Sequence, residues 1–403
     1  MPTKCSKAND RTIVLTYLFV GTVLGGLFYN PADIPSYIQG SLGVINGVNI
    51  YTLQGVVYPP PLYLFAATVF KIVGLHFNLT PSSYVAISVF ACICAVTQSF
   101  VYLLGSKVVA PRNNNKWVLA ALFNPFVIYV SFLYGQMESF VILGVAGVIY
   151  GDIKEQWAIG GAALAVATSV KLYPVVLFLP YIYHNWENAA RIIKGAAPIG
   201  VLTTILMTLY LPQSLTIFSS ASGVVRPVNA IYLASLSFSP KWLVTGLFLL
   251  TFMASTCVSL LMEKEPVRYL IPLVPVVLFY PNILEYRWLP LAVGSLLIGY
   301  LPTQDGISRL CRVYGWLWTL FGTLAMITGT IEGWYEGKLW VVSTFHSLPQ
   351  LPIVFGVWSH SFESILTSPV LFELVVLRGL RTAIAIIFII TVIIWCKRVK
   401  EKH

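Results

Sequence analysis

The sequence predicts an all-α, polytopic membrane protein with about 12 transmembrane helices, and three observations lead to this prediction. The 403 residues are 57% hydrophobic and only 10% charged, whereas a soluble domain carries about 25% charged residues. The mean hydropathy is +0.80. The apolar residues gather in stretches long enough to cross a bilayer, and the basic residues gather in alternate connections between those stretches.

The expected spans follow one another along the whole chain. They cover residues 12–29, 83–106, 117–134, 137–151, 157–170, 172–183, 195–212, 242–262, 268–282, 288–302, 313–331 and 383–396. The first run lacks an A-x-A-like cleavage site, so we expect a retained helix. The apolar run 61–75 follows Tyr58-Pro59-Pro60 and is short for a span. We therefore expect interfacial helices in the first outer loop.

The basic residues predict the orientation. With the N-terminus inside, 17 of the 25 lysines and arginines fall in inside segments, which predicts twelve spans with both termini in the cytoplasm. If 61–75 crossed the bilayer, the basic loop 107–116 would lie outside. The net charge of +10 is explained by this topology and does not point to nucleic acid. Three long segments, 30–82, 213–241 and 332–382, are then expected outside.

The six cysteines do not form a metal motif. Cys92 and Cys94 lie close together in an apolar run, but no histidine or second cysteine pair is near them in the sequence. Because zinc sites need four such ligands at characteristic spacings, buried small hydrophobes are the better interpretation.

Polar residues stand at the predicted outer ends of several spans. Asp33 follows the first span in "YNPADIPSY", Gln136 and Glu138 lie in the turn "LYGQMES", and Lys171 lies in "SVKLYP" between two short apolar runs. Structural roles would account for each of them: an Asx turn or helix cap for Asp33, a helix start for Glu138 and snorkelling for Lys171. Their common side also allows them to share one outward-facing cavity.

Such a cavity has the groups for sugar transfer from a lipid phosphate. A lysine or arginine can stabilise the charge that grows on a phosphate leaving group, and a carboxylate can take the proton of an acceptor hydroxyl. Arg226, in the outer loop "SGVVRPV", is a further candidate for phosphate binding on a mobile lid. Direct attack would invert the anomeric centre, because retention requires a second, close carboxylate.

Residues 12–185 resemble the GT-C superfamily of polyprenyl-phosphate-sugar-dependent glycosyltransferases. The resemblance rests on the acidic residue after the first helix, on "YPPPLY" at residues 58–63, and on the "LYGQMES" and "SVKLYP" stretches in that order. The chain is most similar to mannosyltransferase-like members, including archaeal relatives of GPI mannosyltransferases. The resemblance implies a conserved module over 1–185 and a variable transmembrane region over 186–403, with outer loops 213–241 and 332–382.

The resemblance also implies roles for individual residues. Asp33 matches the catalytic base, Glu138 a second acidic or amide position near the active site, and Lys171 a basic residue near the donor phosphate. Gln136, Tyr58 and Arg226 complete the expected substrate-binding set. A divalent cation, Mn or Mg, is a candidate cofactor with Asp33 and Glu138 as candidate ligands. The paired acidic motif of many members is replaced here by a single Asp33.

The main hypothesis is therefore an inverting hexosyltransferase, with mannose favoured. Its expected partners are a polyprenyl- or dolichyl-phosphate-sugar donor, a glycan or glycolipid acceptor and membrane lipids. The archaeal cell membrane is the favoured location and the ER membrane the alternative. Two alternatives remain: a non-catalytic GT-C-like subunit that binds a glycolipid within a membrane complex, such as a transamidase, and a lipid or solute transporter.

Overall fold

The computed structural model describes residues 4–27, 34–53, 56, 58–72, 74, 84–109, 115–133, 136–210, 241–262, 265–275, 288–302, 306–335, 383–384 and 386–394. All regular elements among these residues are helical, which confirms the predicted all-α class. Asp33, Arg226 and most of the two long outer loops lie outside the described residues.

The helices follow the chain in a simple order. They are α1 (Lys4–Leu27), α2 (Ile34–Ile45), α3 (Pro60–Ile72), α4 (Tyr84–Val108), α5 (Asn115–Leu122), α6 (Pro125–Ile128), α7 (Glu138–Ile153), α8 (Trp157–Val170), α9 (Phe178–His184), α10 (Ala189–Leu209), α13 (Lys241–Leu261), α15 (Leu289–Gly299) and α16 (Gly306–Tyr335). Shorter helical turns are η1 (Ile50–Thr52), η3 (Tyr129–Leu133), η4 (Tyr173–Leu177), η5 (Trp186–Asn188) and η7 (Pro266–Tyr269). A last helical segment covers residues 386–394.

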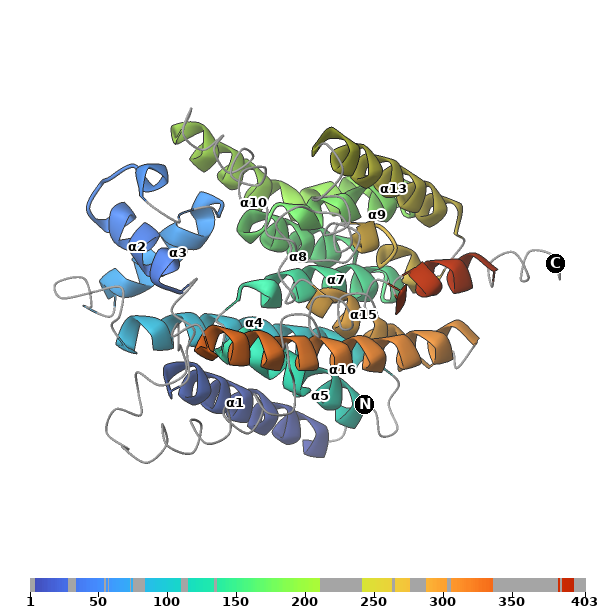
Figure 1. The fold of residues 1–403 in the computed structure, drawn as a ribbon, viewed down its shortest axis with the longest axis horizontal. Helices are drawn as coiled ribbons and strands as arrows, with labels where there is room; N and C mark the ends of the chain where they lie inside the picture. Colours follow the sequence, from blue (N-terminus) through green and yellow to red (C-terminus); the bar gives the residue numbers. More distant parts are fainter. Residues whose placement is uncertain are drawn as a thin grey trace.

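The centre of the bundle is formed by α4, α7, α8 and α15 (Figure 1). Every residue of α15 is buried, and α7 is buried from Glu138 to Gly151 except at Phe140 and Leu143. Small residues bring α7 and α8 together: a Cβ at Gly147 would overlap the side chain of Ala163, and one at Gly144 would crowd Ala167. Close approach through small residues is the usual way in which helices pack within a membrane, because lipid leaves them little hydrophobic drive to associate.

Backbone contact also joins α8 to α10. A Cβ at Gly161 would overlap the carbonyl of Ile192, and a Cβ at Gly195 would overlap that of Ala158. Beyond this crossing α10 extends along the outside of the bundle (Figure 1). Only 6% of its apolar window is buried, compared with 61% for Ser88–Val108 of α4.

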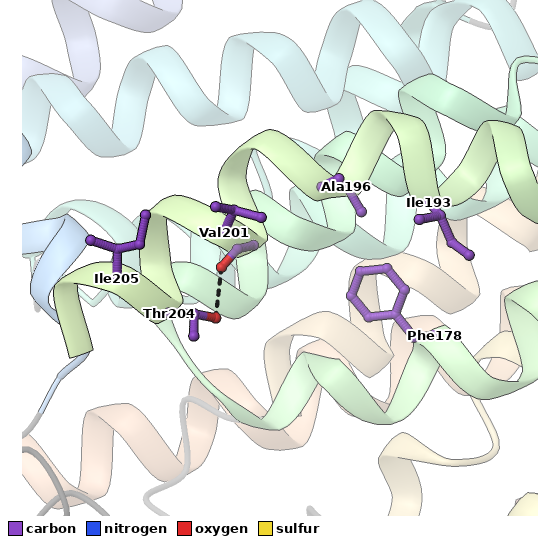
Figure 2. Close-up of a pocket in the computed structure, with 8 residues that line it drawn as sticks. Phe178, Ile193, Ala196, Val201, Thr204 and Ile205 are labelled. Atoms are coloured by element: carbon purple, nitrogen blue, oxygen red, sulfur yellow. Dashed lines mark hydrogen bonds between the residues drawn. The ribbon is translucent and has the colours of Figure 1, made fainter. Parts of the chain in front are cut away.

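An apolar groove runs between α9 and the exposed side of α10. Figure 2 shows Phe178 of α9 below Ile193 and Ala196, with Val201, Thr204 and Ile205 farther along α10. The hydroxyl of Thr204 donates to the carbonyl of Gly200 at 2.9 Å, so it is satisfied within its own helix. This face of α10 therefore presents an apolar surface, because the Thr204 hydroxyl is already hydrogen-bonded within the helix.

Length and hydropathy mark two described helices as candidate spans, Ser88–Val108 and Trp186–Leu209. Five shorter apolar helices accompany them: Thr12–Val23, Pro60–Ile72, Trp157–Val170, Leu249–Leu261 and Leu289–Gly299. The expected number of twelve spans stays a prediction. The part of the run 61–75 up to Ile72 is helical as expected, since α3 covers Pro60–Ile72 and packs against α2 at one end of the molecule (Figure 1).

Two expected continuous spans are broken. The span 117–134 divides into α5, α6 and the π-helical turn η3, because Asn124 caps α6 with Pro125 at its first position. The span 172–183 consists of a 3₁₀ turn and a short α-helix that begins at Phe178, and Pro174 in the 3₁₀ turn lacks the N–H that a continuous α-helix would use. The π-helical turn η3 ends three residues before Gln136, and η4 begins two residues after Lys171.

Candidate functional site

A buried ion pair forms where α7 begins and α8 ends. Glu138 is the first residue of α7, and Lys171 follows the last residue of α8 with an extended backbone. Because the two helices are packed neighbours joined by a short turn, these ends meet. The ammonium nitrogen of Lys171 lies 2.6 Å from Oε1 of Glu138, and the side chains are 3% and 0% exposed.

Two tyrosines complete this cluster. The hydroxyl of Tyr173 donates a hydrogen bond to Oε2 of Glu138. The ring centroid of Tyr58 lies 5.5 Å from the Lys171 nitrogen, within the range of a cation–π contact. We call Glu138, Lys171, Tyr173 and Tyr58 the ion-pair cluster.

The ion-pair cluster also fixes the first outer loop. The backbone N–H of Tyr58 donates to the hydroxyl of Tyr63 at 3.2 Å, and the hydroxyl of Tyr51 donates to the carbonyl of Tyr58 at 3.0 Å. Lys171 therefore connects η4 and α7 to a loop more than 100 residues earlier in the chain.

The electrostatics of the cluster follow from its burial. Removing two charges from water is costly, and the cost is offset only when the geometry is close and the remaining polar atoms are satisfied. Here both oxygens of Glu138 accept a hydrogen bond, one from Lys171 and one from Tyr173. Both oxygens of the carboxylate are thus already engaged by neighbouring donors within the protein.

The same contacts make Glu138 a poor metal ligand. The ammonium of Lys171 lies 2.6 Å from its oxygen, where a cation would have to sit. The described residues also bring no three His, Cys, Asp or Glu side chains together in an arrangement that could hold a metal ion. Glu138 therefore does not fit the expected manganese or magnesium site.

Gln136 is buried beside this cluster in a region rich in polar contacts. Its backbone N–H donates to the carbonyl of Val130 at 3.0 Å, and its own carbonyl lies 3.8 Å from the Cys94 sulfur. Gln98 of α4 donates to Ser131 and Ser139, each at 3.2 Å. These bonds join α4, η3 and α7 behind the ion pair, and a π-turn such as η3 often marks a functional region.

The structure brings together three of the six residues expected to form the site, Glu138, Lys171 and Tyr58, with Gln136 just before Glu138. Asp33 and Arg226 lie outside the described residues. Sequence reasoning missed Tyr173 and Gln98. Tyr173 stands two positions after Lys171 in "SVKLYP", but an aromatic residue there is equally typical of a membrane interface.

A second polar cluster lies at the opposite ends of α7 and α9. One guanidinium nitrogen of Arg268, in η7, donates to Asp152 at 2.8 Å and to the hydroxyl of Tyr269 at 2.9 Å. The ring nitrogen Nε2 of His184 lies 2.8 Å from the carbonyl oxygen of Ser259, whose hydroxyl donates to the carbonyl of Arg268. These bonds connect α7, α9, α13 and η7.

Comparison with known protein families bears on the main hypothesis. Residues 36–263, more than half of the chain, match the PIG-U family, described as GPI transamidase subunit PIG-U. The chain belongs to the PIG-U family. A search of curated proteins found no match.

PIG-U membership corrects the main hypothesis. The family is a multi-pass membrane family and supplies a subunit of a transamidase complex, so the prediction of a hexosyltransferase is wrong. The roles expected for individual residues, that of Asp33 among them, stay predictions. The membrane setting and the relation to GT-C-like proteins are retained, whereas the sugar-phosphate donor is not supported. The division of the chain at residue 185 stays a prediction.

Proposed function

We propose that this protein is a non-catalytic membrane subunit of a GPI transamidase, located in the ER membrane, that binds the glycolipid substrate of the complex. The family match over residues 36–263 carries this proposal. The ion-pair cluster supports it, because the buried carboxylate of Glu138 is already engaged by Lys171 and Tyr173.

Within this function the cluster has two layers. The inner layer is buried: the exposed fractions are 0% for Glu138, 0% for Gln136 and 4% for Lys171. These residues therefore do not contact a ligand directly. Tyr58 and Tyr173 are only partly buried and lie in front of them. We assign contact with the glycolipid head group to these two rings, whose apolar faces and hydroxyl groups suit a sugar or an interface. The ion pair then holds both rings in position.

Complementation tests the proposal. The chain would be expressed in cells that lack their own PIG-U, and surface display of a GPI-anchored reporter would be measured together with recovery of the chain in the transamidase complex. We expect both to be restored. Asp33→Asn should also restore both, because a binding subunit needs no base at that position. Assembly without any reporter at the surface would contradict the proposal.

The tyrosine layer is tested in the same cells. Tyr173→Ala removes a ring and its hydrogen bond to Glu138, and Tyr58→Ala removes a ring that faces Lys171. We expect Tyr58→Ala to reduce reporter display while the variant still assembles. Unchanged display in assembled Tyr58→Ala and Tyr173→Ala variants would exclude these rings as the contact with the glycolipid.

A further inference from the structure

An open groove lies between the first turns of α16 and the last helical segment, 386–394, drawn in red beside the Gly306 end of α16 in Figure 1. Its volume is about 460 Å³. The residues of its lining that matter here are Arg309, Val313, Tyr314, Leu317, Ile384 and Ile387. All of them except Arg309 and the Tyr314 hydroxyl are apolar.

The floor of this groove is held by aromatic packing. The rings of Tyr314 and Phe388 have centroids 5.1 Å apart, and Trp318 lies 5.0 Å from Phe388. The hydroxyl of Tyr314 lies 3.5 Å from that of Thr391, so the polar atom of the floor points to a partner in the neighbouring helix. The groove therefore has a formed base and open apolar walls, with Val313 58% and Ile387 52% exposed.

One cation stands at one end of the groove. Arg309, Val313 and Leu317 follow one another at intervals of four residues, so they lie along one face of α16. Arg309 is exposed and makes no hydrogen bond or ion pair with another described residue. Arg312, by contrast, donates to the carbonyl of Gly299 and lies over the ring of Tyr300. Asp305, four residues before Arg309, lies outside the described part of the chain.

The dimensions fit a lipid. From Arg309 to Leu317 the helix rises about 12 Å at 1.5 Å per residue, close to half of the roughly 30 Å hydrocarbon core. Arg309 belongs to the segment expected at the cytoplasmic surface, where a guanidinium can meet a lipid phosphate. The groove thus has a positive charge at the membrane surface and an apolar wall that extends over one leaflet. This arrangement is complementary to a single anionic lipid.

We propose that this groove binds an anionic glycerophospholipid, with its phosphate on Arg309 and one acyl chain along Val313, Leu317 and Ile387. A transmembrane helix of another protein is the competing occupant. Arg309, the cation among the described residues that line the groove, favours the lipid, because an apolar helix would leave that charge unmatched. The site lies at the predicted inner surface and is independent of the glycolipid site proposed above.

Photocrosslinking in the assembled complex tests this proposal. The complex would be placed in phosphatidylcholine nanodiscs containing either phosphatidylserine or phosphatidylcholine with a photoreactive acyl chain, and labelled peptides would be mapped. We expect the anionic probe to label residues 310–317 and 384–387 about fivefold more than the neutral probe, the ratio for one basic residue near a phosphate. Arg309→Gln should remove this preference and Arg309→Lys should retain it.

Three variants make the outcome decisive. Ile387→Trp fills the groove without changing charge and should lower labelling by both probes. Arg191→Gln alters an exposed arginine that packs on Trp157, away from the groove, and should change nothing. Equal labelling by both probes would overturn the proposal. Protection of the groove from both probes would also overturn it and would indicate that another protein covers the groove. A preference for the anionic probe that appears only after Asp305→Asn would also overturn the proposal, because it would mean that Arg309 pairs with Asp305 in the native chain.

Discussion

Arg268 reaches across 116 positions of the chain to donate a hydrogen bond to Asp152, with 2.8 Å between the nitrogen and the oxygen. The side chains are 6% and 14% exposed, so the pair is shielded from water. Since Asp152 lies in α7 and Arg268 in η7, this bond fixes the segment before α15 to the central helix of the bundle.

Removing one member of this pair should destabilise the protein. We expect Arg268→Gln to lower the free energy of unfolding by about 1–3 kcal/mol, because Asp152 and Tyr269 lose a charged donor. Thermal unfolding of the detergent-solubilised protein would measure the change. The exposed Lys154→Gln, two residues from Asp152, is the matched control, and an equal effect of the two substitutions would show that the bond contributes nothing.

The ion pair of Lys171 and Glu138 should be more sensitive. We expect Lys171→Met to cost about 3–5 kcal/mol, because it leaves a buried carboxylate without its counter-charge. The double variant Lys171→Met/Glu138→Gln should regain part of this loss, since no net charge is then buried. A double-mutant cycle on thermal unfolding would measure the coupling, and purely additive effects would exclude a direct interaction.

The crossing of α8 and α10 depends on the absence of side chains. Gly161→Ala should cost about 1–3 kcal/mol, because its methyl group would enter the space of the Ile192 carbonyl. Gly200→Ala is a control in the same helix pair, since a Cβ there meets nothing within 4 Å. It should be neutral or stabilise by about 0.5–1 kcal/mol. Similar unfolding temperatures for the two variants would contradict the close crossing.

His184 should make stability depend on pH. Desolvation lowers its pKa, more than the hydrogen bond to the Ser259 carbonyl raises it, and Arg268 lowers it further while Asp152 raises it. The unfolded chain, with a pKa of about 6.5, therefore binds a proton before the folded protein does. The contribution of His184 is present above about pH 6.5 and is lost as the pH falls through the window below it.

His184→Gln isolates this effect, because the amide can still donate to the Ser259 carbonyl but does not titrate. Unfolding temperatures of both proteins would be compared between about pH 7.5 and pH 5. We expect the native chain to lose more stability than the variant over this range. Parallel curves would mean that His184 does not contribute to the pH dependence.

Much of the helical framework can be predicted from the sequence, because a long apolar run without proline in a membrane protein has few alternatives to an α-helix. The helices α4, α7, α8 and α13 lie within a few residues of their expected ranges. The predictions of single helices over 117–134 and 172–183 were wrong, because each of these apolar runs contains prolines. Pro125 starts a new helix after the Asn124 cap, and Pro174 lies in a 3₁₀ turn. Hydropathy averages hide such breaks.

The place where Glu138 and Lys171 meet was predictable from the sequence, whereas the roles of the site residues stay predictions. The common sidedness of Glu138 and Lys171 indicated that they could meet, and they do. Their complete burial and the bond from Tyr173 depend on tertiary packing, which local sequence does not encode. Motifs shared with sugar transferases describe a framework and do not by themselves fix an activity. The carboxylate at Glu138 suggested sugar transfer, whereas the matching family is described as a GPI transamidase subunit.

The family match ends at residue 263, whereas the partner of Asp152 is Arg268 and the buried α15 covers part of α7. A chain truncated at the end of the match would leave a bare carboxylate and an uncovered apolar face on its central helix. Expression boundaries and chimaeras should therefore be placed beyond α15. In a domain exchange, Asp152 and Arg268 should come from the same parent.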